Sequence, residues 1–355
     1  MRSGVPRGVR LTVPIVGLGP AGTKAANALR QEAGKLVILD TDPGIDDAMA
    51  LLYLRAVPGI RLHSLTTVFG NADIETTSRN AAFLAARFGL DLPIHVGAAG
   101  PLEGERHVPS LKVHGADGLG GTGVASGTPV PRSTVPAWQH IADTISANPG
   151  RVSLLAIGPL TNLALALRRR PEIAAQVHEV VVMGGAFGTR GRHGNIRPHA
   201  EANFFYDPRA ADEVLAASWP VTAVGLDVSA DCILSSAQAA SMARRFGESG
   251  ELLWAISRDY ADIYRKFDGI DGFCIHDVAA AARLASPELF SVQQAAIGVK
   301  TSGNHTGNAY RSADAMRPVQ SFCDGVDSDR LISGFIDTVA AFVTRDAASE
   351  RIETT

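Results

Sequence analysis

The sequence has few cysteines, no excess of one charge and no long apolar run, and each absence excludes a class of protein. Its three cysteines, Cys232, Cys274 and Cys323, lie far apart without a Cys-x-x-Cys spacing, so neither a disulfide framework nor a zinc site is indicated. The formal net charge is −3, which leaves no broad basic face for a nucleic-acid backbone. No segment has the roughly 18 consecutive apolar residues of a membrane span, and no secretory signal is visible. We therefore expect a globular protein of the cytoplasm that binds neither nucleic acid nor membrane.

Short apolar runs alternate with amphipathic segments from residue 35 onward, which is typical of βα units and a largely parallel sheet. The pattern predicts an α/β fold with a single open, mostly parallel sheet flanked by helices. Strands are expected at 36–40, 62–68, 152–157, 178–183 and 221–226. Helices are expected at 46–56, 73–88, 136–147, 160–169, 208–217, 236–247, 250–266, 276–284 and 328–345. The Gly- and Pro-rich region 97–135 is expected to form loops.

Four aspartates follow the first predicted strand, around a Pro43-Gly44 turn. They are Asp40, Asp42, Asp46 and Asp47. Carboxylates this close repel one another unless a cation neutralises them, and calcium and magnesium prefer such oxygen ligands. A favourable interaction with the N-terminus of the next helix would explain only Asp46 and Asp47. The stretch therefore predicts a metal or catalytic site at the carboxyl end of a strand.

Residues 1–34 contain Gly17-x-Gly19-x-x-Gly22, which fits a dinucleotide-binding fingerprint. The context argues against it, because Pro14 interrupts the proposed strand and the expected acidic residue would have to come from the aspartate cluster. We interpret residues 1–34 as an extension outside the catalytic fold, residues 35–345 as one domain and residues 346–355 as a tail.

Polar residues also follow the later strands, and each has a plain structural alternative. Asn71 follows the second strand as a turn residue or ligand, and Thr161 and Asn162 are best read as helix caps. Glu201 and Asn203 would share a face of an extended segment. The other candidates are Asn195, the His276-Asp277 pair before a helix, and His114 in a Gly-rich loop able to close over a ligand.

Together these pieces resemble the inosine-uridine-preferring nucleoside hydrolase family, over about residues 35–343. The Asp40-Thr-Asp-Pro-Gly-Ile-Asp-Asp47 element is that family's hallmark. The motifs that follow in the family's order are Phe69-Gly-Asn71, His114-Gly-x-Asp-Gly-Leu-Gly120, Gly158-x-Leu-Thr-Asn162, Met183-Gly-Gly185, Asn195, Glu201-x-Asn203 and His276-Asp277. The resemblance implies a Rossmann-like sheet with a calcium ion at the floor of the site.

The resemblance also assigns roles to the matching residues. It implies calcium bound by Asp42, Asp47, the main-chain carbonyl of Ile157 and Asp277. The implied sugar-binding residues are Asp46, Asn71 and Asn203 for the 2′ and 3′ hydroxyls and Asn195 and Glu201 for the 5′ hydroxyl, with His114 as a further substrate-binding residue.

The implied reaction is hydrolysis of the N-glycosidic bond of a ribonucleoside, giving ribose and free base. Asp42 would take a proton from a calcium-bound water, and His276 would protonate the departing base. Family members are commonly dimers or tetramers, so a homo-oligomer is expected. The preferred base is not readable from the sequence.

Two features of the sequence and two other functions keep alternatives open. Ala202 stands where many relatives carry an aromatic residue. The loop at 188–198 has an unusual density of basic residues, which indicates either simple solvation or an anionic substrate. The alternative functions are a non-catalytic, metal-dependent nucleoside or sugar sensor, and a phosphatase using Asp40 and Asp42.

Overall fold

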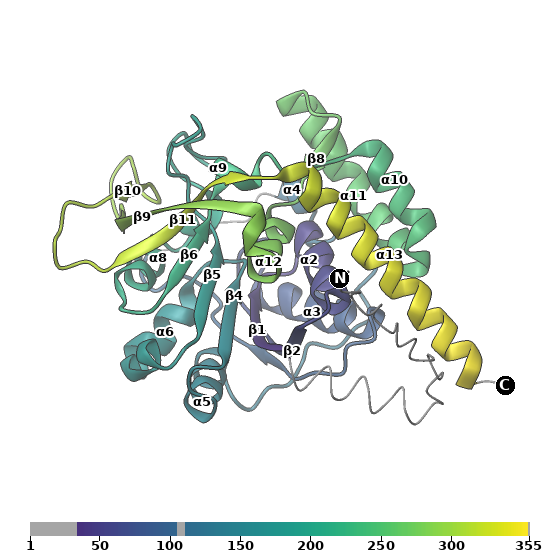
Figure 1. Cartoon of the computed structure of the whole chain (residues 1–355), viewed down its shortest axis with the longest axis horizontal. Helices are drawn as coiled ribbons and strands as arrows, with labels where there is room; N and C mark the ends of the chain where they lie inside the picture. Colours follow the sequence, from purple (N-terminus) through teal and green to yellow (C-terminus); the bar gives the residue numbers. More distant parts are fainter. Residues whose placement is uncertain (1–33, 105–110, 354–355) are drawn as a thin grey trace, which may run out of the picture.

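The computed structural model describes residues 34–104 and 111–353, and a nine-stranded sheet forms its centre (Figure 1). The strand order is β10-β9-β11-β6-β5-β4-β1-β2-β3. The strands are β1 (Lys35–Thr41), β2 (Ile60–Thr67), β3 (Ile94–Val96), β4 (Val152–Ala156), β5 (Glu179–Met183), β6 (Val221–Val224), β9 (Phe290–Val299), β10 (Ala309–Arg311) and β11 (Val319–Val326). The pairs from β11 to β3 are parallel, while β9 pairs antiparallel with β11 and β10. A separate two-stranded sheet joins β7 (Ile233–Ser235) to β8 (Gly272–Cys274).

Helices cover both faces of the sheet (Figure 1). One face carries α2 (Ile45–Ala56), α3 (Ile74–Arg87), α10 (Ser236–Arg245), α11 (Gly247–Asp268), α12 (His276–Ala285) and α13 (Ser328–Glu353). The other carries α5 (Ala137–Ala147), α6 (Thr161–Arg169) and α8 (Pro208–Ala216). Successive β1 side chains enter alternate cores, Val37 and Leu39 on the first face and Leu36 and Ile38 on the second. This burial on both faces explains the unbroken apolar run before Asp40.

The predicted α/β fold and its mostly parallel sheet are confirmed. All five predicted strands and all nine predicted helices are present within a few residues of their expected bounds. The last helix, α13, continues past its predicted end at residue 345 to Glu353. The glycine pattern at 17–22 lies outside the described residues, as does nearly all of the predicted extension. In the described part of the chain, none of the helices is long and apolar enough to span a membrane.

The strands that were not predicted are short or half exposed. The first seven residues of β9 are exposed or partly buried and include Gln293 and Gln294, and only its last three residues are buried, so it lacks the long apolar run by which the central strands were found. β3, β7, β8 and β10 have three residues each. Patterns this short carry little periodic signal.

The strand order reverses beside β1. The chain proceeds from β1 to β2 and β3 on one side, and from β4 to β5 and β6 on the other. In open parallel sheets, ligands bind outside the carboxyl ends of strands at such a switch point. The polar residues after β1, β2 and β4 therefore meet at the edge where a ligand site is expected.

Candidate functional site

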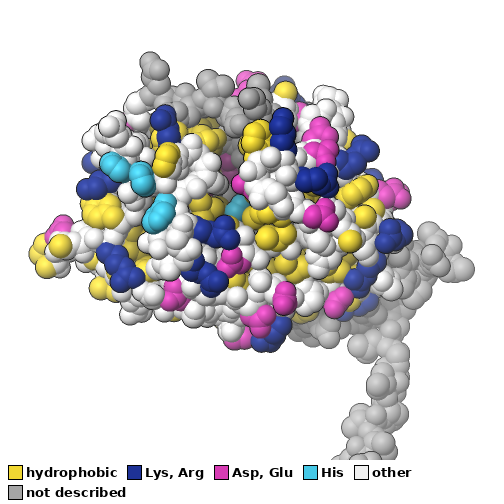
Figure 2. Space-filling view, turned by 90° about the horizontal axis from the view of Figure 1, so that it is seen from above, with side chains coloured by type: hydrophobic (Ala, Val, Ile, Leu, Met, Phe, Trp, Pro, Cys, Tyr) yellow, Lys and Arg dark blue, Asp and Glu magenta, His cyan; other side chains and the backbone are white. Residues whose placement is uncertain are grey.

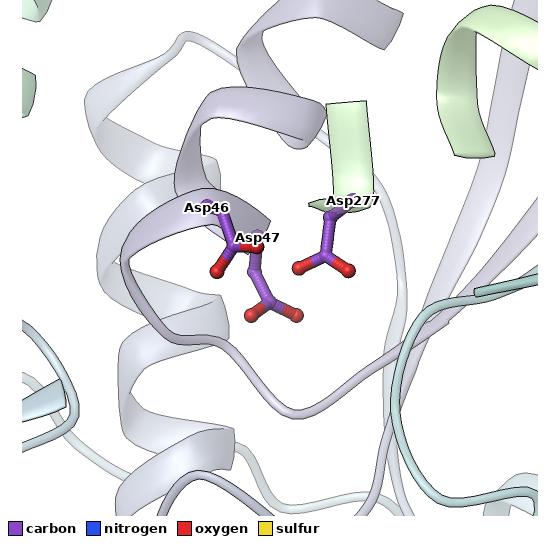
Figure 3. A group of neighbouring side chains, drawn as sticks. All are labelled: Asp46, Asp47 and Asp277. Carbon is purple, nitrogen blue, oxygen red and sulfur yellow. The ribbon is translucent and has the colours of Figure 1, made fainter. Parts of the chain in front are cut away.

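Three carboxylates meet at the start of two helices (Figure 3). Asp46 and Asp47 lie in the first turn of α2, and Asp277 lies in the first turn of α12. One oxygen from each lies within 4.8 Å of the others, and all three side chains are buried. The two helices pack against each other, so segments far apart in sequence deliver the cluster. Both helix N-termini face it, where their dipoles favour negative charge.

The cluster is strongly destabilising unless protons or a cation neutralise it. Burial, followed by the charge of Asp47, raises the pKa of Asp46 to about 7. Burial raises the pKa of Asp277 well above its usual range, and the charges of Asp46, Asp47 and Asp42 act in the same direction. Burial also raises the pKa of Asp47, although hydrogen bonds from Thr41 and Gly44 oppose the shift. The arrangement is chemically suited to a hard divalent cation.

Asp42 lies beside this cluster and has one unused oxygen. Its side chain is 1% exposed, and Oδ1 has no hydrogen-bond partner among the described residues. Its Oδ2 accepts from the Asn71 backbone N–H at 2.7 Å. A Cβ at Gly158 would lie 2.6 Å from Oδ1, and one at Gly70 would clash with Oδ2. The carboxylate therefore occupies a slot between two glycines, with one oxygen available to a proton or a cation.

Asn71 and Thr41 orient the acidic residues. The Asn71 amide Nδ2 donates to Asp47 Oδ2 at 3.1 Å and to the Asp42 carbonyl at 3.2 Å. The Thr41 hydroxyl donates to Asp47 Oδ1 at 2.5 Å, and the Gly44 N–H donates to Asp47 Oδ2 at 2.9 Å. These bonds fix Asp47 and leave the Asn71 Oδ1 atom for a ligand.

The Ile157 carbonyl lies where β4 ends, on the wall of the same cavity. It accepts from the Asn203 amide Nδ2 at 3.0 Å, and the same amide donates to the Met183 carbonyl at 3.1 Å. A carbonyl oxygen has two lone pairs, so this bond leaves one for a cation. Asn203 thereby joins the ends of β4 and β5 while its Oδ1 remains for a ligand.

Glu201 and Asn203 do not share an extended segment, so that prediction is wrong. Glu201 is the N-cap of the short helix α7 (Ala202–Tyr206), and Asn203 lies within that helix. The Glu201 carboxylate accepts from the backbone N–H groups of Asn203, Phe204 and Gly185 at 2.8–3.1 Å. Burial raises the pKa of Glu201 to about 7 against these bonds. Both side chains still line the cavity, because the helix begins at its edge.

Figure 2 looks onto the face above the strand ends and shows a hollow at its centre. The cavity there is lined by predicted residues from many segments, namely Asp46, Asn71, His114, Ile157, Asn195, Glu201, Asn203, His276 and Asp277. Asp42 and Asp47, which were also predicted, are not among the lining residues. The sequence prediction missed Tyr206, Tyr260 and Tyr264 in the wall. The spacing of Tyr260 and Tyr264, four residues apart on α11, is the signal that could have revealed a shared face.

His276 is held on both ring nitrogens. Its Nδ1 lies 2.9 Å from Ser229 Oγ, and its Nε2 lies 3.1 Å from the Tyr264 hydroxyl, which lies 3.3 Å from the Tyr260 hydroxyl. Burial, and next the charge of Arg192, lowers the pKa of His276 to about 4. His276 is neutral at pH 7 and ends a chain of hydroxyl groups.

His114 lies in the cavity wall beside the turn that follows β1. Its Nδ1 accepts from the Ile45 N–H at 3.3 Å, at the start of α2. Burial lowers its pKa to about 4. A neutral ring that accepts at Nδ1 carries its proton on Nε2, so His114 is a hydrogen-bond donor in the cavity wall.

Thr161 and Asn162 do not cap α6, contrary to prediction. The Thr161 hydroxyl donates to Asp207 Oδ2 at 2.7 Å. The Asn162 amide donates to Asp40 Oδ1 at 2.8 Å and to the Thr67 carbonyl at 2.9 Å, and its Oδ1 accepts from the Ala98 N–H at 2.9 Å. Asn162 therefore ties together the carboxyl ends of neighbouring strands beneath the site.

The arginines of the basic loop, residues 188–198, have partners within the protein. Arg190 and Arg192 both pair with Asp231, at 3.2 and 2.9 Å. The Arg197 guanidinium lies 5.1 Å from the centre of the Phe205 ring. An anionic substrate is not needed to explain these charges.

Comparison with known proteins places this geometry in context. The family model described as inosine-uridine preferring nucleoside hydrolase matches residues 37–333. The chain is 36% identical to the probable uridine nucleosidase 2 of Oryza sativa subsp. japonica, over 75% of this chain and 79% of that protein. It is 36% identical to the non-specific ribonucleoside hydrolase RihC of Klebsiella pneumoniae (strain 342), over 76% and 85%. A solved plant nucleoside hydrolase, the PpNRh1 enzyme, superimposes with a TM-score of 0.81 at 31% identity, covering 86% of this chain and 99% of that one.

Proposed function

This chain belongs to the inosine-uridine preferring nucleoside hydrolase family, and from that premise we propose that it hydrolyses ribonucleosides, uridine and inosine among them, to ribose and free base. It is a glycosidase that acts on N-glycosyl compounds. The observation that carries the proposal is the meeting of a buried carboxylate cluster, a neutral imidazole and amide side chains around one cavity. Relatives named as uridine nucleosidases support uridine as a substrate, and the family's description supports inosine as well.

We propose calcium as the cation, held by Asp47, Asp277, Asp42 and the Ile157 carbonyl, with Asp46 close by. The fit rests on the three oxygens within 4.8 Å and on the unpartnered Asp42 Oδ1. When bound, a hard divalent ion neutralises the carboxylates and polarises the water and hydroxyl oxygens that it contacts.

We propose that the ribose binds with its 2′ and 3′ hydroxyls directed at the carboxylate cluster. Asp46, Asn71 and Asn203 supply oxygen and amide groups for the 2′ and 3′ hydroxyls, while Asn195 and Glu201 supply them for the 5′ hydroxyl. These groups are fixed by hydrogen bonds to the backbone or to one another. Prearranged groups of this kind stabilise charge that develops on the sugar without reorganising at the moment of reaction.

Asp42 is proposed as the general base. Its Oδ1 is buried and unpartnered, and burial, with the charge of Asp47 next, raises the pKa of this carboxyl. A carboxylate with a raised proton affinity accepts a proton from the attacking water more readily. Turning Asp42 away is opposed by the close approach of Gly70 and Gly158.

The departing base is proposed to leave beside His276 and Tyr264. Both line the cavity and are hydrogen-bonded to each other at 3.1 Å. A neutral imidazole and a phenol are donors rather than strong acids, so their role is to hydrogen-bond the base and to hand over a proton as negative charge grows on it.

Two other functions are less well supported. A sensor that only binds a sugar diol would not need an unpartnered buried carboxylate and a hydrogen-bonded imidazole in one cavity. A phosphatase using Asp40 and Asp42 is disfavoured, because the Asp40 carboxylate is turned toward Thr66 and Asn162. Burial raises the pKa of Asp40 to about 7, which opposes a nucleophilic role.

The test is release of reducing sugar from a panel of purine, pyrimidine and modified ribosides, measured with calcium and after chelation. Hydrolysis of uridine or inosine that is lost on chelation supports the proposal. Stoichiometric nucleoside binding without sugar release would instead identify the sensor. The resemblance also predicts a cytoplasmic homodimer or homotetramer, for which size-exclusion chromatography with light scattering would test the assembly.

A further inference from the structure

Residues 225–231, which lie between β6 and β7, contact both sides of the cavity. It contains the short helix α9 (Leu226–Ser229). Its side chains reach alternately in two directions: Asp227 and Asp231 contact the basic loop and the residues just before it, while Ser229 contacts His276. One short segment therefore holds a loop on one wall of the cavity and the imidazole on the other.

Asp227 fixes the entry into the basic loop. It is fully buried, and its two oxygens accept from the backbone N–H groups of Phe187 and Thr189, each at 2.7 Å. The Thr189 hydroxyl adds a third bond at 2.9 Å. The Leu226 N–H also donates to the Gly185 carbonyl at 2.9 Å. These bonds hold the chain where it leaves β5.

Asp231 fixes the next part of the loop, through Arg190 at 3.2 Å and Arg192 at 2.9 Å. The carboxylate is 26% exposed, while each arginine side chain is more exposed. The backbone here is glycine-rich, and Gly188 and Gly191 have φ angles of +73° and +72°. Because glycine restricts the backbone least, the two arginine contacts restrain this part of the loop, together with the Thr189 bonds and the Gly191 N–H bond to the Gly188 carbonyl at 3.3 Å.

The cavity residue that follows is Asn195. Its Oδ1 accepts from the Ala202 N–H at 3.0 Å, which leaves the two amide hydrogens for a ligand. Asn195 is exposed, and the residues that follow it hold it, because its backbone N–H also donates to the Ala200 carbonyl at 3.1 Å. On its other side, its position depends on how firmly residues 188–194 are held.

We infer that Asp231 is a positioning residue for sugar recognition: through Arg190 and Arg192 it holds the basic loop so that the Asn195 amide meets the 5′ hydroxyl of the substrate. The inference rests on the proposed function, because Asn195 is assigned there to that hydroxyl. The inference explains two of the basic residues of the loop, Arg190 and Arg192, by their pairing with Asp231. It also makes residues 225–231 a common support for the sugar end and the base end of the site.

The experiment compares kcat/KM for inosine and for 5′-deoxyinosine, on the full chain with calcium. The ratio of the two values measures recognition of the 5′ hydroxyl and cancels any general loss of active protein. Asp231→Asn keeps the shape of the side chain and removes its charge. Glu213→Gln is the matched control, because Glu213 also pairs with two arginines, Arg168 at 2.7 Å and Arg209 at 2.6 Å, and is 24% exposed.

In Asp231→Asn we expect the ratio to fall roughly fivefold or more, as follows from losing about 1 kcal/mol of ion pairing. The fall should be larger for inosine than for 5′-deoxyinosine, because any effect of Arg192 on His276 acts on both substrates and cancels in the ratio. Glu213→Gln should keep the wild-type ratio. A double Arg190→Ala/Arg192→Ala variant should show the same fall, and adding Asp231→Asn to it should change nothing further, because all three act through one contact.

An unchanged ratio in both Asp231→Asn and the double arginine variant would overturn the inference, as would an equal fall in Glu213→Gln. Absence of inosine hydrolysis by the wild-type protein is a different result, since it would overturn the proposed function itself. The second variant keeps the test decisive if Asp231→Asn does not fold.

Discussion

The carboxylate cluster makes a quantitative prediction about how pH and calcium act on stability. In the metal-free protein, burial raises the pKa of Asp46 from 3.8 to about 7. The folded state then binds more protons than the unfolded state between these values, so this contribution to stability is fully present below pH 3.8 and is lost as pH rises to about 7. Calcium and protons compete for the same oxygens. Calcium should therefore stabilise the protein more at high pH.

The size of this loss of stability follows from the shift in the pKa of Asp46. Between pH 5.5 and pH 8, Asp46 alone should cost the metal-free protein about 2 kcal/mol, at 1.36 kcal/mol for each unit of pKa difference. At about 2 °C per kcal/mol for a chain of this size, the melting temperature should fall by about 4 °C. Asp47 and Asp277, whose pKa values are raised too, should enlarge the fall.

The assay is thermal unfolding of protein freed of metal by dialysis, at both pH values, with and without saturating calcium. We expect the calcium-induced rise in melting temperature to be larger at pH 8 than at pH 5.5, and Asp46→Asn to reduce the difference. Glu213→Gln, a surface substitution outside the cluster, should leave the difference between the two pH values unchanged. A calcium effect equal at the two pH values, or larger at pH 5.5, would refute the reasoning.

Three further predictions concern catalysis. Asp42→Ala should lower kcat by several orders of magnitude with the circular dichroism spectrum unchanged, because a general base contributes roughly 10²- to 10⁴-fold and a metal ligand is lost as well; near-normal turnover would remove Asp42 from the mechanism. A chain starting at Lys35 should hydrolyse its substrate at close to the full-length rate, since the proposed site residues all follow that position; loss of activity in folded protein, or binding of NAD or FAD by the full chain, would restore the glycine-pattern interpretation of residues 17–22. His276→Ala should slow inosine hydrolysis more than hydrolysis of p-nitrophenyl riboside, whose leaving group needs little protonation, with calcium content unchanged; equal losses on both would assign His276 to positioning.

The features that the sequence predicted best are those that depend on a local pattern of residues. The apolar run before Asp40 predicted a buried strand, and the four aspartates predicted an acidic site at its end. The central strands and the helices followed from the same periodicities. Residues that line the cavity from many segments could be named because family motifs preserve their order, although their roles rest on resemblance.

The sequence could not show side-chain contacts between residues that lie far apart in the chain. Thr161 looks like a helix cap, but its acceptor Asp207 lies 46 residues later. Tyr264 looks like one more amphipathic residue of α11, and only the fold brings its hydroxyl to His276. The pKa of His276 depends on burial by the whole domain. The arginines of the basic loop could not be assigned until Asp231 was placed beside them.

The meeting of α2 and α12 at the carboxylate cluster has a consequence for how the chain matures on the ribosome. Asp46 and Asp47 are synthesised early, while Asp277 comes from α12, much later in the chain. At roughly 5–20 residues per second, tens of seconds separate the two. During that interval the early aspartates have no third carboxylate and no second helix N-terminus to complete their environment. We expect nascent chains stalled before α12 to bind calcium weakly, so that tight calcium uptake marks the moment at which α12 has docked against α2.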